Sequence, residues 1–214
     1  TVTQMIHDIL LADGRKVLLG GNVRGVSTLS LLKEVTEEHT AVLELDSWQC
    51  HGFGEAKMSP HIAVFTTFMD DHLLYYKNDV TAYLDDKAQI FLNQKEGDLL
   101  VLGEQAKETV LTAYGERIRA KVVTPEALPD AVELQVPGAH NRYNAALAMA
   151  ATQAYGVSEE CIFSTLRSFK GLEGRLELVQ EKDGIRFYND TNSTTPEAAL
   201  VALKALGEKR NIVL

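Results

Sequence analysis

Short apolar runs alternate along the chain with longer stretches in which apolar residues recur every three or four positions. A continuous apolar run is typical of a strand buried on both faces, and the spaced pattern is typical of an amphipathic helix. The runs that predict buried strands are residues 16–19, 41–45, 61–68 and 99–102. Because these strands alternate with helical or looped crossovers, we expect an α/β fold with a mostly parallel sheet flanked by helices.

The clearest helical pattern opens the chain. Apolar residues at positions 2, 5, 6, 9 and 10 fall on one face of a helix, and Gly14 predicts a left-handed end to it. Further helices are expected over residues 29–35 and 79–93. The apolar face of the helix at 79–93 consists of Val80, Tyr83, Leu84 and Phe91.

Two more helices are expected in the second half of the chain. One follows Asn141 and includes the apolar residues 145–151, and the other covers residues 158–169 with Ser158 as its N-cap. Between the helix at 79–93 and these two, residues 117–123 and 131–136 have the composition of strands. We expect these two strands to be an antiparallel addition to the sheet.

A glycine-containing stretch at residues 170–174 predicts a domain boundary, because the strand and helix pattern restarts after it. Strands at 176–180 and 185–188 flank a turn at Asp183 and Gly184, which predicts a hairpin. We therefore expect one domain over residues 1–172 and the beginning of another over residues 173–214.

A polar loop then leads into a helix. Thr195 is well suited as the N-cap and Pro196 as the first helical residue, and the helix is expected to end near Gly207. Residues 211–214 predict one more strand.

Composition and net charge argue against some classes of function. Hydrophobic residues make up 45% of the chain and charged residues 24%, as in ordinary soluble globular proteins. The net charge of −9 and the lack of a basic face argue against a general binder of nucleic acid or membrane surfaces. The apolar run at 145–151 is too short to cross a bilayer. Cys50 and Cys161 show neither a metal spacing nor a disulfide framework, which favours a cytoplasmic protein with reduced thiols. We expect the protein to be a monomer.

Asp70, Asp71 and His72 end the apolar run at residues 61–68. Ligands of open α/β sheets bind beyond the carboxyl ends of the strands, so these side chains could hold a metal ion or orient a phosphate. A capped turn with solvated acids explains the same residues when they are considered alone.

Three further residues extend this pattern. Glu44 lies at the end of the second predicted strand, and Asn141 opens a later helix. Lys87 lies on the apolar face of the helix at 79–93, where lysines are uncommon. A lysine there either has a chemical role or extends its amine past the apolar face into water.

Seven stretches carry a resemblance to a known family. They are Gly20-Gly21-Asn22, LELDSWQ (43–49), FMDDH (68–72), YLDDKAQI (83–90), GAHNRYNAA (138–146), GRLE (174–177) and NDTNSTTPEA (189–198). In this order and spacing the chain resembles the Mur ligase family of ATP-dependent ligases over essentially its whole length. It is most similar to the members that add D-glutamate to UDP-N-acetylmuramoyl-L-alanine.

The resemblance implies a three-domain protein with an N-terminal uridine-binding domain, a central P-loop-type ATPase domain and a Rossmann-like C-terminal domain. Thr1 would then lie at or just after the Gly-Lys-Ser/Thr of the phosphate loop. Residues 1–172 would be most of the central domain, and residues 173–214 the start of the C-terminal domain. On this interpretation we expect the chain as given to lack ligase turnover.

The resemblance also implies the chemistry. ATP phosphorylates the terminal carboxylate of the UDP-linked muramoyl substrate, and the amine of D-glutamate attacks the acyl phosphate. Mg²⁺ would neutralise charge between the two anions. Glu44 and His72 match the metal-binding residues of the family. Lys87 matches a lysine that carries a carbamate, which converts the cationic side chain into an anion directed at the metal.

Other positions match nucleotide or substrate contacts of the family. The implied nucleotide contacts are Thr1, Asn141, Asn144, Arg175 and Asp190. The implied substrate contacts are Asn22, Asp46, Gln49 and Thr194. Each has a structural alternative: Glu44 could be a buried strand-end carboxylate, Asn141 an N-cap and Arg175 a surface strand residue.

Two departures from the family pattern bear on function. An acid, Asp46, replaces the first hydroxyl of the common Glu-x-Ser-Ser, and Asn192 replaces the lysine of the common Asp-Ser-Lys. Two alternatives therefore stay open. One is a ligase of the same superfamily that adds another amino acid or acts on folate, and the other is a non-catalytic nucleotide-binding remnant.

Overall fold

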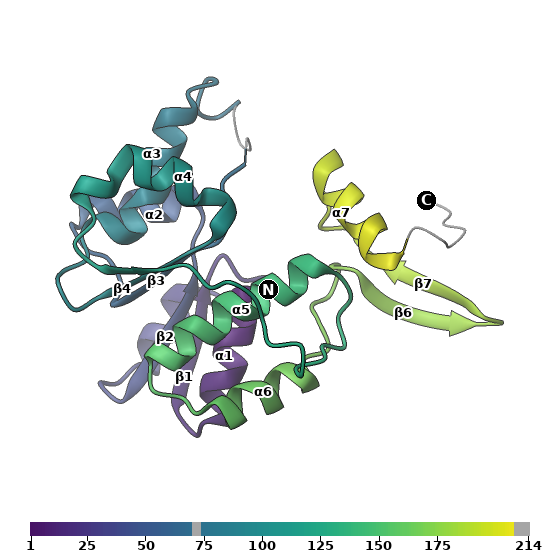
Figure 1. The fold of residues 1–214 in the computed structure, drawn as a ribbon. Coiled ribbons are helices and arrows are strands. Elements are labelled where there is room, and N and C mark those ends of the chain that lie inside the picture. The colour runs from purple at the N-terminus through teal and green to yellow at the C-terminus, as the bar shows by residue number, and fades with distance from the viewer. Residues whose placement is uncertain (70–73, 208–214) are drawn as a thin grey trace.

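The computed structural model describes residues 1–69 and 74–207. The expected α/β architecture is confirmed: two parallel sheets lie among helices, and a separate hairpin follows them (Figure 1). The predicted strand at 211–214 and the residues Asp70, Asp71 and His72 lie outside the described residues.

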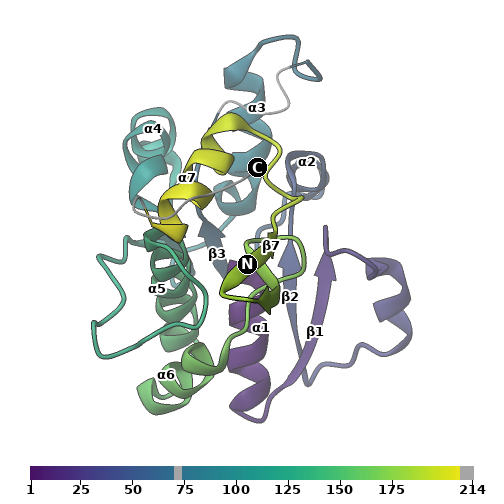
Figure 2. The same ribbon diagram turned by 90° about the vertical axis from the view of Figure 1, so that its right-hand side faces the viewer.

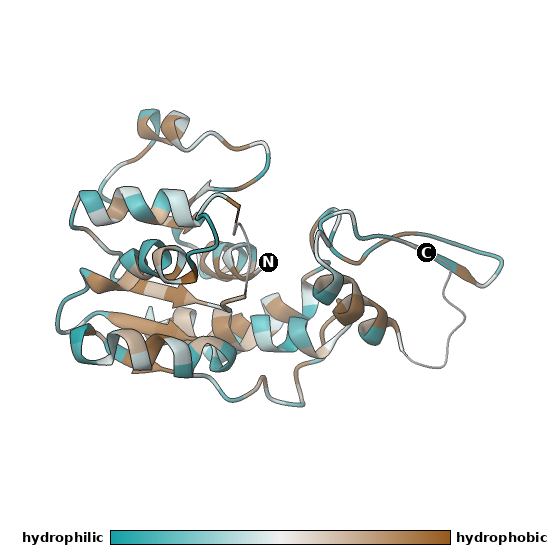
Figure 3. Ribbon diagram, turned by 90° about the horizontal axis from the view of Figure 1, so that it is seen from above, coloured by the Kyte–Doolittle hydropathy of each residue, from teal (hydrophilic) through white to brown (hydrophobic). Residues whose placement is uncertain are grey.

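The first sheet pairs β1 (Lys16–Gly21) with β2 (His39–Glu44) in parallel, so that Gly21 lies opposite Glu44. The second sheet has the order β3-β4-β5 and is also parallel. Its strands are β3 (Ile62–Phe65), β4 (Leu99–Leu102) and β5 (Lys121–Val123). The sheets are rich in apolar residues, and polar residues face outwards on the helices around them (Figure 3).

Helices cover both faces of the second sheet. On one face, α1 (Val2–Ala12), α5 (Ala139–Ala154) and α6 (Glu159–Ser168) share a core with residues of both sheets. On the other face, α3 (Val80–Leu92) and α4 (Glu104–Tyr114) form a second core.

Strand β4 lies between these two cores. Val101 belongs to the core of α1 and α5, whereas Leu100 and Leu102 belong to the core of α3 and α4. All three side chains are fully buried. Successive strand residues point to opposite faces, so an unbroken apolar run is what this position requires.

The C-terminal segment has its own arrangement. Strands β6 (Glu177–Lys182) and β7 (Ile185–Asn189) form the predicted antiparallel hairpin, which projects away from the two sheets (Figure 1). Its turn residues Asp183 and Gly184 both have positive φ, as the sequence predicts for a tight hairpin turn. Helix α7 (Pro196–Leu206) begins as expected, with the Thr195 side chain accepting a hydrogen bond from the backbone nitrogen of Ala198.

Four local predictions are wrong. Residues 131–136 form no strand in the described structure, and β5 pairs in parallel with β4 rather than antiparallel. Arg142 explains the irregular path, since its guanidinium donates to the carbonyl oxygens of Leu128 and Val132 and so holds that segment against α5. Residues 29–35 give only the exposed 3₁₀ helix η1 (Thr28–Lys33). The strand at 61–68 ends at Phe65.

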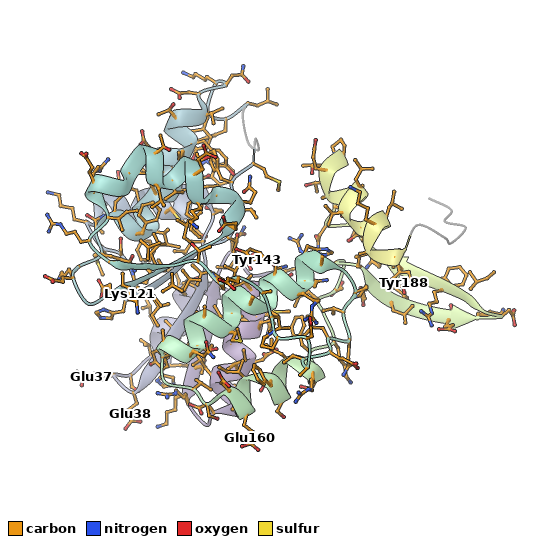
Figure 4. All side chains as sticks on the ribbon, in the orientation of Figure 1. Glu37, Glu38, Lys121, Tyr143, Glu160 and Tyr188 are labelled. Carbon is orange, nitrogen blue, oxygen red and sulfur yellow. The ribbon has the colours of Figure 1, made fainter. Side chains whose placement is uncertain are left out.

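Two helices were not predicted, although the apolar residues Ala106, Val110 and Tyr114 of α4 are spaced four residues apart, as in an amphipathic helix. Helix α2 (Ser47–Glu55) contains Gly52 and Gly54, residues that disfavour helices. It forms because Asp46 caps it and because it packs closely on α3, where a Cβ at Gly54 would lie 2.6 Å from the Gln89 side chain. Helix α4 is held at its start by Tyr143 of α5, whose hydroxyl accepts a hydrogen bond from the backbone nitrogen of Glu104 at 2.6 Å (Figure 4).

Within residues 1–69 and 74–207, every helix is too short or too polar to span a membrane.

Candidate functional site

A pocket of about 140 Å³ lies where the start of α1, the start of α5 and the C-terminal segment meet. The five residues expected to contact a nucleotide all line it: Thr1, Asn141, Asn144, Arg175 and Asp190. They come from positions up to 189 residues apart in the chain, from Thr1 to Asp190. The fold therefore brings together residues that the sequence could relate only by resemblance.

The first turn of α5 forms one wall of the pocket. Gly138 is the N-cap, so the alternative of Asn141 as the N-cap is wrong. Asn141 is instead a buried first-turn residue whose side-chain nitrogen donates to the carbonyl oxygen of Pro137 at 2.8 Å. Only glycine fits at 138, because φ is +101° and a Cβ would lie 2.8 Å from that of Ala205. The end of α7 thereby approaches the start of α5 (Figure 2).

The opposite wall comes from the loop before α7. The Asp190 carboxylate accepts hydrogen bonds from the backbone nitrogen of Leu176 at 2.9 Å and from the Ser193 hydroxyl at 2.5 Å. Asn192 adds a backbone bond to the carbonyl oxygen of Gly174 at 3.0 Å. These bonds fasten the loop to the turn that carries Arg175, whose side chain is exposed at the pocket.

His140 also lines this pocket, and the sequence interpretation did not single it out. Burial lowers the pKa of its imidazole, and the nearby Asp190 carboxylate opposes that shift only in part. The residue stands between Gly138 and Asn141 in a stretch that carried the family resemblance. Its place in that stretch is the signal by which the sequence could have identified His140 as a site residue.

The end of β2 adjoins the pocket. The backbone nitrogen of Thr1 lies 4.0 Å from Oε2 of Glu44. Asn22 is brought to the same place, because its backbone nitrogen donates to the carbonyl oxygen of Glu44 at 2.6 Å. Gly21 makes this approach possible: its φ is +83°, and a Cβ there would lie 2.0 Å from the same carbonyl oxygen.

Asp46 and Gln49, two expected substrate contacts, form a reciprocal cap at the start of α2. The backbone nitrogen of Gln49 donates to the Asp46 carboxylate at 2.8 Å, and the backbone nitrogen of Asp46 donates to the Gln49 side-chain oxygen at 3.1 Å. Such a capping box satisfies two helix-terminal N–H groups. Both residues therefore have a structural function, whatever else they contact. Thr194 lies exposed in the loop before α7.

Lys87 is half-buried on α3, with its amine 4.9 Å from the centre of the Tyr83 ring. Burial raises the pKa of the Cys50 thiol on α2 to about 11, and the charge of Lys87 acts in the opposite direction. Lys87 therefore lies at the α2–α3 interface. The apolar face expected around it is only partly buried, because Tyr83, Leu84 and Phe91 are buried whereas Val80 is exposed.

Within the described ranges no three His, Cys, Asp or Glu side chains are grouped so that they could hold a metal ion. His72, one of the three expected ligands, lies outside those ranges. Glu44 and Thr1 both bear side-chain oxygen atoms, the donors that Mg²⁺ prefers, and the backbone nitrogen of Thr1 lies 4.0 Å from the Glu44 carboxylate.

Residues 1–127 match the Mur ligase middle domain. The chain belongs to the Mur ligase family. It is 34% identical to the UDP-N-acetylmuramoylalanine--D-glutamate ligase of Ruminiclostridium cellulolyticum, over 98% of the chain and 49% of that protein. It is 32% identical to the ligase of the same name from Thermoanaerobacter sp., over 100% of the chain and 51% of that protein.

Solved structures show the same fold at lower identity. Acinetobacter baumannii MurF superposes with a TM-score of 0.75 at 19% identity, covering 98% of this chain and 52% of that one. Thermotoga maritima MurF in complex with ADP gives 0.71 at 19% identity, covering 96% and 54%. The folylpolyglutamate synthase of Thermotoga maritima gives 0.64 at 18% identity, covering 96% and 63%. This Mur ligase chain spans about half the length of the curated relatives it matches.

Proposed function

We propose that this chain is the nucleotide-binding part of a ligase that adds D-glutamate to UDP-N-acetylmuramoyl-L-alanine, a step of peptidoglycan precursor synthesis in the cytoplasm. The observation that carries the proposal is the single pocket that collects Thr1, Asn141, Asn144, Arg175 and Asp190. Support also comes from relatives that bear this enzyme's name and match nearly the whole chain. Residues 1–172 would act as the central domain and residues 173–214 as the start of the next.

In the proposed reaction the carboxylate of the L-alanyl group attacks the γ-phosphorus of ATP, and ADP leaves. The amine of D-glutamate then attacks the acyl carbon, loses a proton and displaces inorganic phosphate, so that an amide bond forms. Both steps bring anions together, and catalysis depends on positioning and on local positive charge.

The residues of the pocket suit the nucleotide. The amides of Asn141 and Asn144 offer a donor and an acceptor, which match the edge of an adenine. Arg175 supplies a guanidinium suited to phosphate oxygens. Asp190 is held by Leu176 and Ser193 and so keeps Arg175 and the loop before α7 in place.

Mg²⁺ would be held by Thr1, Glu44, His72 and a carbamylated Lys87, and it would neutralise phosphate charge. Glu44 is set in place for this role by the parallel pairing of β2 with β1 and by the close approach of Gly21. Asn22, beside Glu44, would face the muramoyl substrate with Asp46, Gln49 and Thr194. The proposed partners are thus small anionic molecules and the proposed state is a monomer, with no role for nucleic acid or membrane.

The test uses the full-length protein with UDP-N-acetylmuramoyl-L-alanine, ATP and D-glutamate. ADP release that requires D-glutamate, with a product heavier by one glutamyl group, is the expected result. Arg175→Ala should raise the KM for ATP, whereas Arg186→Ala on the exposed hairpin is the matched control and should not. Release of ADP with a folate or with another amino acid, but not with D-glutamate, would contradict the proposal and favour another ligase of the superfamily.

A further inference from the structure

Side chains from three segments meet at the α2–α3 interface. The Tyr76 hydroxyl donates a hydrogen bond to Oδ2 of Asp86 at 2.8 Å, and Nδ1 of His51 lies 2.7 Å from Oδ1 of the same carboxylate. One carboxylate therefore ties together the turn at residues 74–78, helix α3 and helix α2.

The proposed reaction residues lie on these three segments or close to them in the sequence. Lys87 is the immediate neighbour of Asp86 on α3, and His72 precedes Tyr76 by four residues in the sequence. Helix α2 starts directly after Asp46 and close behind Glu44. The nucleotide pocket, in contrast, is built from α1, α5 and the C-terminal segment.

The link is buried on its tyrosine side. Tyr76 is only 8% exposed, and burial raises the pKa of its phenol to about 12, so the hydroxyl keeps the proton that it donates to Asp86. The Asp86 side chain is 21% exposed and has His51 as a second partner, so loss of the tyrosine donor weakens the link without leaving the carboxylate unpaired. The close packing of Gly54 against Gln89 leaves α2 and α3 little room to slide past each other. The three segments are thereby locked into one arrangement.

We propose that Asp86 is a positioning residue for the ligase reaction, holding Lys87 and the first turn of α2 in place without touching substrate. This inference rests on the proposed function. The inference predicts that kcat changes while the KM for ATP does not. Loss of the link should lower kcat, because the reacting groups are misplaced, and leave the KM for ATP unchanged, because the nucleotide residues lie on other elements.

The neighbouring residue provides a matched control. Asp85 accepts a hydrogen bond from the Tyr114 hydroxyl of α4, and burial also raises the pKa of that phenol. Tyr114 is 4% exposed and Tyr76 8%, so the two phenols are similarly buried, although Asp85 is more exposed than Asp86. Helix α4 carries none of the proposed reaction residues.

The experiment compares Tyr76→Phe and Asp86→Asn with Tyr114→Phe and Asp85→Asn in the full-length protein. All four should lower the melting temperature to a similar extent. Only the first pair should lower kcat, by about 10- to 100-fold, with an unchanged KM for ATP. In hydrogen exchange, Asp86→Asn should deprotect residues 47–55 together with residues 74–78, whereas Asp85→Asn should deprotect α4.

Equal kcat values for the two pairs, or a matching rise in the KM for ATP, would overturn the inference and make Asp86 a structural residue. If Asp86→Asn does not fold, the kcat of Tyr76→Phe tests the inference instead. This variant removes one hydroxyl and leaves the Asp86 carboxylate paired with His51. A wild-type protein without D-glutamate-dependent activity rejects the proposed function and the inference with it. An active wild type with a fully active Tyr76→Phe variant rejects the inference alone.

Discussion

The side-chain nitrogen of Asn192 donates a hydrogen bond to the carbonyl oxygen of Glu173 at 3.2 Å. This bond joins the loop before α7 to the turn that carries Arg175. It occurs at the position where the family pattern has a lysine, so the amide replaces a charge with a local cross-link.

Asn192→Lys should therefore change kinetics more than folding. The bond is exposed, and its loss should cost no more than about 1 kcal/mol of the free energy of unfolding. A lysine beside the nucleotide pocket should alter the KM for ATP or kcat. Urea unfolding and steady-state kinetics measure the two effects, with Asn192→Ala as the control that removes the bond without adding charge. A large fall in stability with unchanged activity would show that Asn192 is needed mainly for the loop.

Lys87→Ala should yield a folded but nearly inactive full-length enzyme. The amine of Lys87 is half-buried and lies 4.9 Å from the centre of the Tyr83 ring, and a carbamate there would convert this cation into an anion. Activity should then fall in buffer depleted of CO₂ and return when bicarbonate is added. Full activity without CO₂, together with an active Lys87→Arg enzyme, would leave Lys87 as a side chain that packs on α3.

Gly21→Ala should damage both stability and the site. The substitution combines a left-handed φ of +83° with a Cβ placed 2.0 Å from the Glu44 carbonyl oxygen. Gly14→Ala is the matched control, since φ is +79° and nothing lies within 4 Å of its Cβ. The control should cost about 1 kcal/mol from backbone strain alone, and Gly21→Ala clearly more. Equal losses in urea unfolding would mean that the backbone at Glu44 yields easily.

The stability of the fold should depend on His140 below neutral pH. Burial lowers the pKa of His140 in the folded state, so the unfolded chain binds more protons as the pH falls below the ordinary value of about 6.5. The contribution of His140 is therefore complete above that pH and is lost as the pH falls towards the folded pKa. His140→Asn should remove this part of the decline between pH 7.5 and about 5.5. The unfolding free energies of His140→Asn and of the wild type should be compared at both pH values. An equal decline in the two proteins would contradict the assignment to His140.

Local chemistry explains what the sequence could predict. The hairpin turn at Asp183 and Gly184 and the cap at Thr195 depend on neighbouring residues, so their signals are contained in a few positions. Helix α2 has a local signal at its start, the capping box of Asp46 and Gln49, but Gly52 and Gly54 disfavour a helix until α3 packs against it. The failure at residues 131–136 has the same origin, because Arg142 of a later helix determines their path.

The site shows the same limit. A resemblance in sequence could name Thr1, Asn141 and Asp190, but only the fold brings them to one pocket. The capping box of Asp46 and Gln49 and the contact of Lys87 with Tyr83 are contacts that exist only in the folded conformation. The triplet that ends at His72 was prominent in the sequence and lies outside the described residues, so its part in the site stays a prediction.

The position of β4 between two cores has a consequence for cooperativity. Because Leu100 and Val101 face different helical layers, neither layer can open while β4 stays intact, and both should melt in one transition. Among the described residues, neither core extends beyond Leu172, so the hairpin and α7 form a separate unit of local stability. Native-state hydrogen exchange should release the amides of β6 and β7 through small openings, and those of β4 only through global unfolding. The proposed nucleotide pocket thus lies where residues of the two-sheet body and residues of the C-terminal segment meet.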